Sequence, residues 1–164
     1  GLINEKSFKK TNKLMKELKS DSKYTILSGG NIDSKTNYFC EPTIVTCKKH
    51  SDKIFNHEFF APILAVYKYS ENDVDNTMKL CRDSNNYALT GSVFGNDKKF
   101  IEKSTKFFKE KCGNFYINDK STGSVVGHQP FGGSGCSGTN DKAGDINLLY
   151  RLFNQQTVKK NNNF

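Results

Sequence analysis

The sequence of 164 residues contains no tryptophan, only three prolines and only two methionines. It has no apolar run close to the ~18 residues that a membrane-spanning helix needs. Its first residues lack both the apolar stretch of a signal peptide and an initiator methionine. With 35% hydrophobic residues, we expect one ordinary domain with a modest core. These absences argue against a membrane protein, and we expect the natural N-terminus to lie further upstream.

The cysteines and histidines form no pattern that indicates a metal site or a disulfide framework. The five cysteines show no Cys-x-x-Cys spacing, and the three histidines show no metal spacing with them. An odd number of cysteines without a framework suits a reducing compartment. We therefore expect free thiols and no metal. The residues are Cys40, Cys47, Cys81, Cys112, Cys136, His50, His57 and His128.

The formal net charge is +8, a balance that in other chains signals nucleic acid or anionic membranes. The lysines are scattered, however, and eleven of the 23 fall on two segments with a helical pattern, residues 9–19 and 98–111. On such segments they line solvated faces. No nucleic-acid-binding motif accompanies them, so we expect neither a nucleic acid nor a membrane as partner.

The hydrophobic pattern predicts strands that alternate with helices. Apolar residues at helical spacing predict helices over 5–20, 74–81 and 97–111. Short β-branched or aromatic runs predict strands over 24–27, 43–46, 63–69, 87–94 and 115–117, and residues 31–37 are expected to be a polar loop. This order is typical of βαβ units, so we expect an α/β fold with a mainly parallel sheet and flanking helices.

A long glycine-rich loop follows the last of these strands. Seven glycines lie in the segment from Gly113 to Gly138, which also holds Val125, Val126 and several hydroxyl side chains. Loops of about 20 residues without secondary structure are unusual in compact domains and are commonly functional. Ligands of open α/β sheets bind beyond the carboxyl ends of the strands. We therefore expect a binding loop here.

The same loop resembles a known family. The run Pro130-Phe131-Gly132-Gly133, followed by Ser137-Gly138, resembles the C-terminal part of the aldehyde dehydrogenase superfamily. The flanking residues 118–127 and 139–142 narrow the resemblance to the 1-pyrroline-5-carboxylate dehydrogenases. The resemblance implies the C-terminal portion of that fold. It implies the C-terminal part of the catalytic domain over residues 1–132, a return segment over 133–146 and an oligomerisation strand with a tail over 147–164.

A second motif, Glu58-Phe59-Phe60-Ala61-Pro62, resembles the Glu-x-Phe-Gly-Pro motif of that family. The resemblance implies NAD as cofactor, with the Glu58 carboxylate accepting from the ribose hydroxyls and Phe60 touching the nicotinamide. Without it, Glu58 is an ordinary surface carboxylate and Phe60 a core residue. Ala61 stands where the family has glycine. If that position requires a positive φ, we expect the local turn to differ from that of the family.

The resemblance also implies a substrate end. Gly123 and Ser124 would hold the α-carboxylate of glutamate semialdehyde, and Phe131 would pack on its aliphatic chain. Taken alone, Ser124 is as well explained by a loop hydroxyl that caps its own backbone, and Phe131 by ordinary burial. His128 stands where relatives have Gln, and we expect no catalytic role for it.

The catalytic cysteine and the dinucleotide-binding domain of the family would lie upstream of everything matched, and Cys136 is not expected to replace the nucleophile. We therefore expect no catalytic residue in this chain. It resembles a fragment of an NAD-dependent enzyme that oxidises L-glutamate γ-semialdehyde to L-glutamate in proline catabolism, as a homo-oligomer in the mitochondrial matrix. The alternative is an inactive truncated paralogue that acts as an interaction module.

Overall fold

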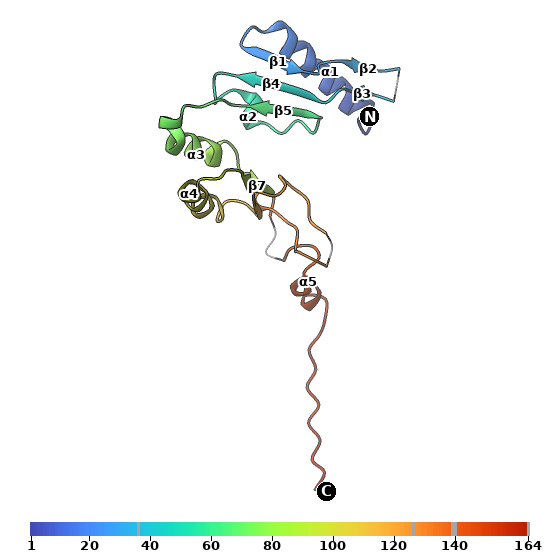
Figure 1. Ribbon diagram of the computed structural model, residues 1–164. Helices are drawn as coiled ribbons and strands as arrows, with labels where there is room; N and C mark the ends of the chain where they lie inside the picture. The colour runs from blue at the N-terminus through green and yellow to red at the C-terminus, as the bar shows by residue number, and fades with distance from the viewer. Residues whose placement is uncertain (36, 126, 139–140, 164) are drawn as a thin grey trace. The chain divides into compact units, whose positions relative to one another are not determined.

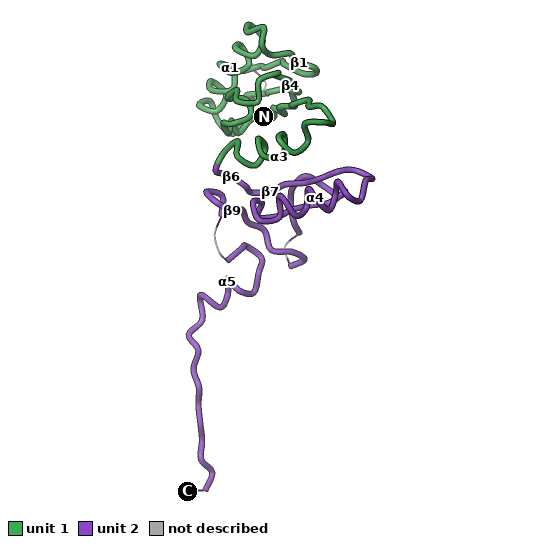
Figure 2. Tube along the Cα trace, turned by 90° about the vertical axis from the view of Figure 1, so that its left-hand side faces the viewer, with its two compact units in different colours: residues 1–85 green, residues 86–164 purple. Residues whose placement is uncertain are grey.

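The fold was analysed in a computed structural model, which describes residues 1–35, 37–125, 127–138 and 141–163. The chain divides into two compact units, Gly1–Asn85 and Asn86–Phe164 (Figure 2). Three residues of the predicted motifs, Val126, Thr139 and Asn140, lie outside the described residues.

A three-stranded sheet forms the centre of the first unit (Figure 1). Its strands are β1 (Tyr24–Ser28), β4 (Thr43–Cys47) and β5 (Ile63–Val66), in the order β1-β4-β5. β4 runs antiparallel to β1 and parallel to β5. A separate antiparallel pair joins β2 (Ile32–Asp33), which lies in the segment 31–37 expected to be a polar loop, to β3 (Phe39–Cys40), which follows it. The strand predicted over 63–69 therefore ends three residues early, at Val66.

Helix α1 (Glu5–Ser20) covers one face of this sheet. The Asn4 side chain caps its start by accepting a 2.9 Å hydrogen bond from the Ser7 N–H. Its inward residues Leu14, Met15 and Leu18 join Tyr24, Val45 and Cys47 in the hydrophobic core. The remaining buried positions of the helix are Phe8 and Thr11. The predicted helix over 5–20 is confirmed, because a complete apolar stripe at helical spacing has one face to bury.

The carboxylate of Asp52 connects the sheet to the short helix α2 (Lys53–Asn56). It accepts hydrogen bonds from the Tyr24 hydroxyl at 2.7 Å and the Ile54 N–H at 3.0 Å, and it pairs with Lys23 Nζ at 3.2 Å. Burial acts to raise the pKa of Asp52, but these three partners outweigh it and hold the pKa below its usual value. Burial and the bond to Asp52 raise the pKa of Tyr24 to about 12.

The first unit ends with a 3₁₀ turn, η1 (Glu71–Asp73), and helix α3 (Val74–Asp83). The second unit is built on one βαβ unit. Strands β7 (Thr90–Val93) and β8 (Asn114–Ile117) pair in parallel, with helix α4 (Lys98–Phe108) between them. The short strands β6 (Tyr87–Ala88) and β9 (Ser134–Gly135) form an antiparallel pair.

The expected α/β class is confirmed, but strand pairing is mixed. In the part of the chain that the structure describes, two pairs are parallel and three antiparallel. In this single chain, the described residues of the segment expected to hold an oligomerisation strand, 147–164, form no strand. Helix α5 (Ile146–Tyr150) occupies its start, and residues 153–163 are exposed without regular structure. A strand is stable only with a neighbour to complete its hydrogen bonds.

None of the five cysteines is paired in a disulfide bond among the described residues. Among the described residues, no group of three or more His, Cys, Asp or Glu side chains lies close enough together to hold a metal ion. No helix of these residues is both long and apolar enough to cross a membrane.

Candidate functional site

The turn before β5 exposes two of the predicted site residues. Glu58 is exposed, and the Phe60 ring is 84% exposed. Between them, Phe59 turns inward, packs against the core and makes an edge contact with His57 at 5.0 Å. Phe60 is therefore not the core residue that the pattern alone suggests. An exposed aromatic ring next to a free carboxylate is an arrangement that can receive a planar, hydroxyl-bearing ligand.

Backbone strain lies at Phe60 itself. Its φ is +53°, a left-handed conformation that a bulky side chain rarely adopts. Such strain is found at functional sites when the surrounding structure enforces it. The chain just after Phe60 is held to β4, because the Pro62 carbonyl accepts a 2.9 Å hydrogen bond from Thr43 N–H and Thr43 is buried. Ala61 does not have a positive φ, so alanine fits at this position without strain.

Tyr116 of β8 anchors the first half of the predicted substrate-binding loop. The hydroxyl of this buried tyrosine donates a 2.8 Å hydrogen bond to the Gly123 carbonyl. The Gln129 side-chain amide donates to the same hydroxyl at 3.2 Å and to the same carbonyl at 3.4 Å. The position of Gly123 is thus determined by two side chains from different parts of the unit.

A second anchor, Asn114, fixes the other half of the loop. Its Nδ2 donates to the Pro130 carbonyl at 2.9 Å, and its Oδ1 accepts from Gly132 N–H at 3.2 Å. Between these two contacts, half-buried Phe131 exchanges two backbone hydrogen bonds with Ala143. Because Asn114 and Tyr116 are two residues apart on a strand, both anchors lie on one face of β8. The structure therefore brings the Gly123 and Phe131 segments to the same face.

Asn118 holds the base of the loop. Its side chain accepts from Gly95 N–H and donates to the Gly95 carbonyl, both at 2.8 Å, and its φ is +50°. This double contact joins the segment after β8 to the segment after β7. It fixes the direction in which the chain leaves the sheet.

Hydrogen-bond donors at the tip of the loop remain free. Among the described residues, neither the N–H groups of Gly123 and Ser124 nor the Ser124 hydroxyl has a hydrogen-bond partner. Gly123 has a φ of +91°, and no atom lies within 4 Å of the place where a side chain would begin. Two adjacent N–H groups and a hydroxyl in a fixed turn can bind a carboxylate. His128, by contrast, is exposed and carries no contact that indicates a role.

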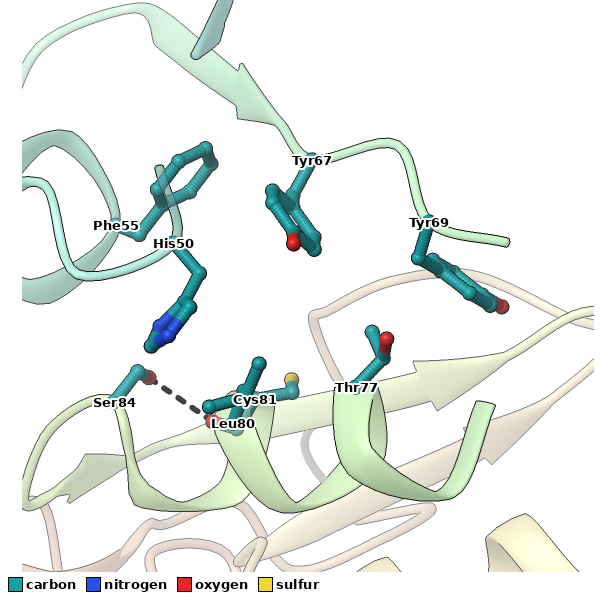
Figure 3. Close-up of a pocket in the computed structure, with 8 residues that line it drawn as sticks. All are labelled: His50, Phe55, Tyr67, Tyr69, Thr77, Leu80, Cys81 and Ser84. Carbon is teal, nitrogen blue, oxygen red and sulfur yellow. Dashed lines mark hydrogen bonds between the residues drawn. The ribbon is translucent and has the colours of Figure 1, made fainter. Parts of the chain in front are cut away.

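The first unit also contains a cavity of about 270 Å³ beside α3 (Figure 3). Phe55 and Tyr67 line it from one side, in an edge contact at 5.8 Å, and Thr77, Leu80 and Cys81 line it from the helix. Ser84 closes one end by donating to the Cys81 carbonyl at 3.0 Å. None of the five predicted site residues lines this cavity, so it is not the site that the sequence indicates.

Residues 1–158 match the profile of the aldehyde dehydrogenase family. The chain belongs to the aldehyde dehydrogenase family. It is 44% identical over 160 residues to the mitochondrial delta-1-pyrroline-5-carboxylate dehydrogenase of Danio rerio, covering 98% of this chain and 29% of the relative.

Two solved structures of the same family resemble the chain closely. The delta-pyrroline-5-carboxylate dehydrogenase from Mycobacterium tuberculosis superposes with a TM-score of 0.80 at 37% identity, covering 91% of this chain and 28% of the other. The 1-pyrroline-5-carboxylate dehydrogenase from Thermus, solved with bound NAD, has a TM-score of 0.77 at 31% identity, covering 92% and 28%. The chain thus spans less than a third of these aldehyde dehydrogenases.

Sequence reasoning missed the residues that hold the family's loop. The sequence pattern assigned no role to Gln129 or Asn114, and it placed Tyr116 only in a strand. One signal could have identified Tyr116, because a buried tyrosine hydroxyl needs a partner and the nearest loop is rich in backbone acceptors.

Proposed function

We propose that this chain is the C-terminal part of an NAD-dependent dehydrogenase that oxidises L-glutamate γ-semialdehyde, formed from 1-pyrroline-5-carboxylate, to L-glutamate in proline catabolism. Its matched relatives are named delta-1-pyrroline-5-carboxylate dehydrogenases, which supports this activity. Several are also named mitochondrial, which supports a place in the mitochondrial matrix. The observation that carries the proposal is the fixed turn at Gly123, whose carbonyl is bound while the neighbouring donors are free.

The substrate roles follow from the chemistry of this turn. The N–H groups of Gly123 and Ser124 and the Ser124 hydroxyl would donate to the α-carboxylate of the semialdehyde. Phe131 would lie beside its methylene groups. A small acidic aldehyde needs donors at one end and an apolar wall along its chain, and both come from one anchored loop.

Glu58 and Phe60 would hold the cofactor. An exposed carboxylate can accept from two adjacent ribose hydroxyls, and an exposed ring offers a flat apolar face to nicotinamide, so both residues fit NAD. Bound NAD would supply the hydride acceptor of the oxidation. Because the nucleophilic cysteine would come from a part of the enzyme outside these residues, we expect the isolated chain to turn over no aldehyde.

The domain boundaries belong to the same proposal. Residues 1–132 would complete the catalytic domain, residues 133–146 would return to it, and residues 147–164 would become a strand when a second subunit supplies a partner. Several large apolar side chains of this last segment are exposed in the single chain, which supports a role in association: Tyr150 at 61%, Leu152 at 75%, Phe153 at 64% and Val158 at 82%.

The same exposed tail favours the second candidate, a truncated paralogue without activity that binds other subunits. A chimeric enzyme separates the two. In it, the C-terminal part of the Danio rerio relative is replaced by this chain, and NADH formation is measured with glutamate semialdehyde. We expect activity in the chimera and none in the isolated chain.

A Glu58→Gln chimera should lose affinity for NAD more than for the aldehyde, because a charged hydrogen bond contributes about 1.5–3 kcal/mol. A folded chimera that binds NAD but forms no NADH would support the interaction module instead. An unchanged KM for NAD in the Glu58→Gln chimera would remove Glu58 from the cofactor site.

A further inference from the structure

A lysine-lined groove of about 630 Å³ lies in the first unit, at the end of β5 opposite the Glu58 turn. We call it the basic groove and define it by four lysines and two threonines: Lys23, Thr25, Thr46, Lys48, Lys49 and Lys68. None of these residues belongs to the site proposed above.

The sheet topology explains why these residues meet. Tyr24 at the start of β1 pairs with Cys47 at the end of β4, which brings Lys23 next to Lys48. β4 and β5 are parallel, so the residues that follow both strands leave the sheet at the same edge. Lys68, two residues after β5, therefore reaches the groove. This edge is the carboxyl end of a parallel pair, where ligands of α/β sheets bind.

Two threonine hydroxyl groups line the groove. Thr25 and Thr46 are direct partners in the β1–β4 register, so their side chains lie together on one face of the sheet. This face is opposite to the one that carries Tyr24 and Cys47 into the core. Paired hydroxyls add donors that are suited to phosphate oxygens.

The groove carries unbalanced positive charge. Lys23 is neutralised, because it pairs with Asp21 and Asp52, both at 3.2 Å. Lys48, Lys49 and Lys68 have no ion pair among the described residues, and no carboxylate lines the groove. Three positive charges around a concave surface raise the local concentration of anions.

We propose that the basic groove binds a small anion that carries two or more phosphate groups. Three positive charges from two separate loops exceed the negative charge of one phosphate group. Lysine binds phosphate as a point charge, without the bidentate geometry that arginine uses. Its volume lies within the ~300–1,000 Å³ of small-molecule sites. Single-stranded nucleic acid is disfavoured, because none of the described residues that line the groove is aromatic or an arginine that could stack on bases.

The test uses the 164-residue chain and inorganic pyrophosphate, with binding measured by calorimetry at constant ionic strength. Lys48→Gln combined with Lys49→Gln should weaken binding roughly tenfold, the scale expected when two charged contacts are lost. The matched control, Lys13→Gln with Lys16→Gln, removes the same charge from the exposed face of α1 and should leave the dissociation constant within about twofold. Circular dichroism verifies that both variants are folded.

If the double variant does not fold, Lys68→Gln on the other loop replaces it, with an expected loss of about threefold. Vesicles that contain a bisphosphorylated phosphoinositide identify the source of the phosphates. Groove-dependent vesicle binding that pyrophosphate displaces assigns a lipid headgroup, and pyrophosphate binding without vesicle binding assigns a soluble ligand. Equal loss in the groove and control variants, or no binding to either probe, would overturn the proposal.

Discussion

The hydroxyl of Tyr116 donates a 2.8 Å hydrogen bond to the backbone carbonyl of Gly123. Through this contact a buried residue of β8 determines where the tip of the glycine-rich loop lies. The carbonyl is directed to the protein, so the neighbouring N–H groups and the Ser124 hydroxyl remain free for a ligand. The conformation of this loop therefore depends on a side chain, Tyr116, that is not among the residues proposed to bind the substrate.

Replacing Tyr116 by phenylalanine should loosen the loop without removing it. The Gly123 carbonyl loses its main donor, and the cost should be about 1 kcal/mol, as for a neutral hydrogen bond. Hydrogen exchange of the peptides that cover residues 118–129 should accelerate. The control is Tyr150→Phe, which changes an exposed tyrosine of α5 and should alter neither exchange nor stability. Equal exchange in wild type and Tyr116→Phe would show that the loop does not depend on this bond.

The strained backbone at Phe60 predicts that a glycine variant will be more stable than an alanine variant at this position, the reverse of the usual order. Because its φ is +53°, glycine should be more stable than alanine at this position, by about 1 kcal/mol. Leu64 lies four residues later in β5, is 59% exposed and has no positive φ. Glycine at Leu64 should be less stable than alanine, by about 0.5–1 kcal/mol. Urea unfolding of the four variants gives both differences, and the same sign at both positions would contradict the strain.

Asp52 should contribute stability that disappears in acid. Its pKa in the folded chain is lowered, so its contribution is complete above the pKa of an unfolded aspartate and is lost as the pH falls through the lower folded value. Asp52→Asn should cost about 1–2 kcal/mol at pH 7, because its partners lose a charged acceptor. The difference from wild type should shrink below about pH 4.

Urea unfolding at several pH values measures this difference. The control Asp21→Asn removes the exposed partner of the same lysine and should cost little. A difference between Asp52→Asn and wild type that does not change with pH would mean that Asp52 acts through its size and not through its charge.

Local sequence patterns predicted much of this fold, because such a pattern by itself determines which conformation buries its apolar residues. The stripe of Phe8, Leu14, Met15 and Leu18 could be buried only as a helix, and α1 has the predicted bounds. The tail could not be predicted in the same way. Leu152 and Phe153 alternate as in a strand, but a strand also needs a neighbour, and in the single chain the segment stays exposed.

The predicted site shows the same division. The glycines, Ser124 and the Glu58 motif could be recognised in the sequence, because a loop that approaches a ligand needs these residue types. The contacts that shape the loop join residues far apart in the sequence, 18 positions from Asn114 to Gly132 and 23 from Gly95 to Asn118, and depend on the packing of β8. The positive φ at Phe60 likewise occurs beside a hydrogen bond between residues distant in the sequence, from Thr43 N–H to the Pro62 carbonyl, which no local pattern encodes.

Ser124→Ala in the chimeric enzyme should impair substrates that carry a carboxylate more than those that do not. The hydroxyl contributes only when the acid is present, and the N–H groups of Gly123 and Ser124 remain, so activity should fall without vanishing. We expect kcat/KM for glutamate semialdehyde to fall roughly tenfold, which corresponds to about 1.4 kcal/mol. A neutral aldehyde of similar length should lose much less, because it makes no hydrogen bond to the Ser124 hydroxyl that the variant could remove. The matched control is Thr122→Ala, which removes an exposed hydroxyl from the same loop and should leave both substrates unchanged. Equal losses on the acidic and the neutral aldehyde would mean that Ser124 shapes the loop and does not bind the carboxylate.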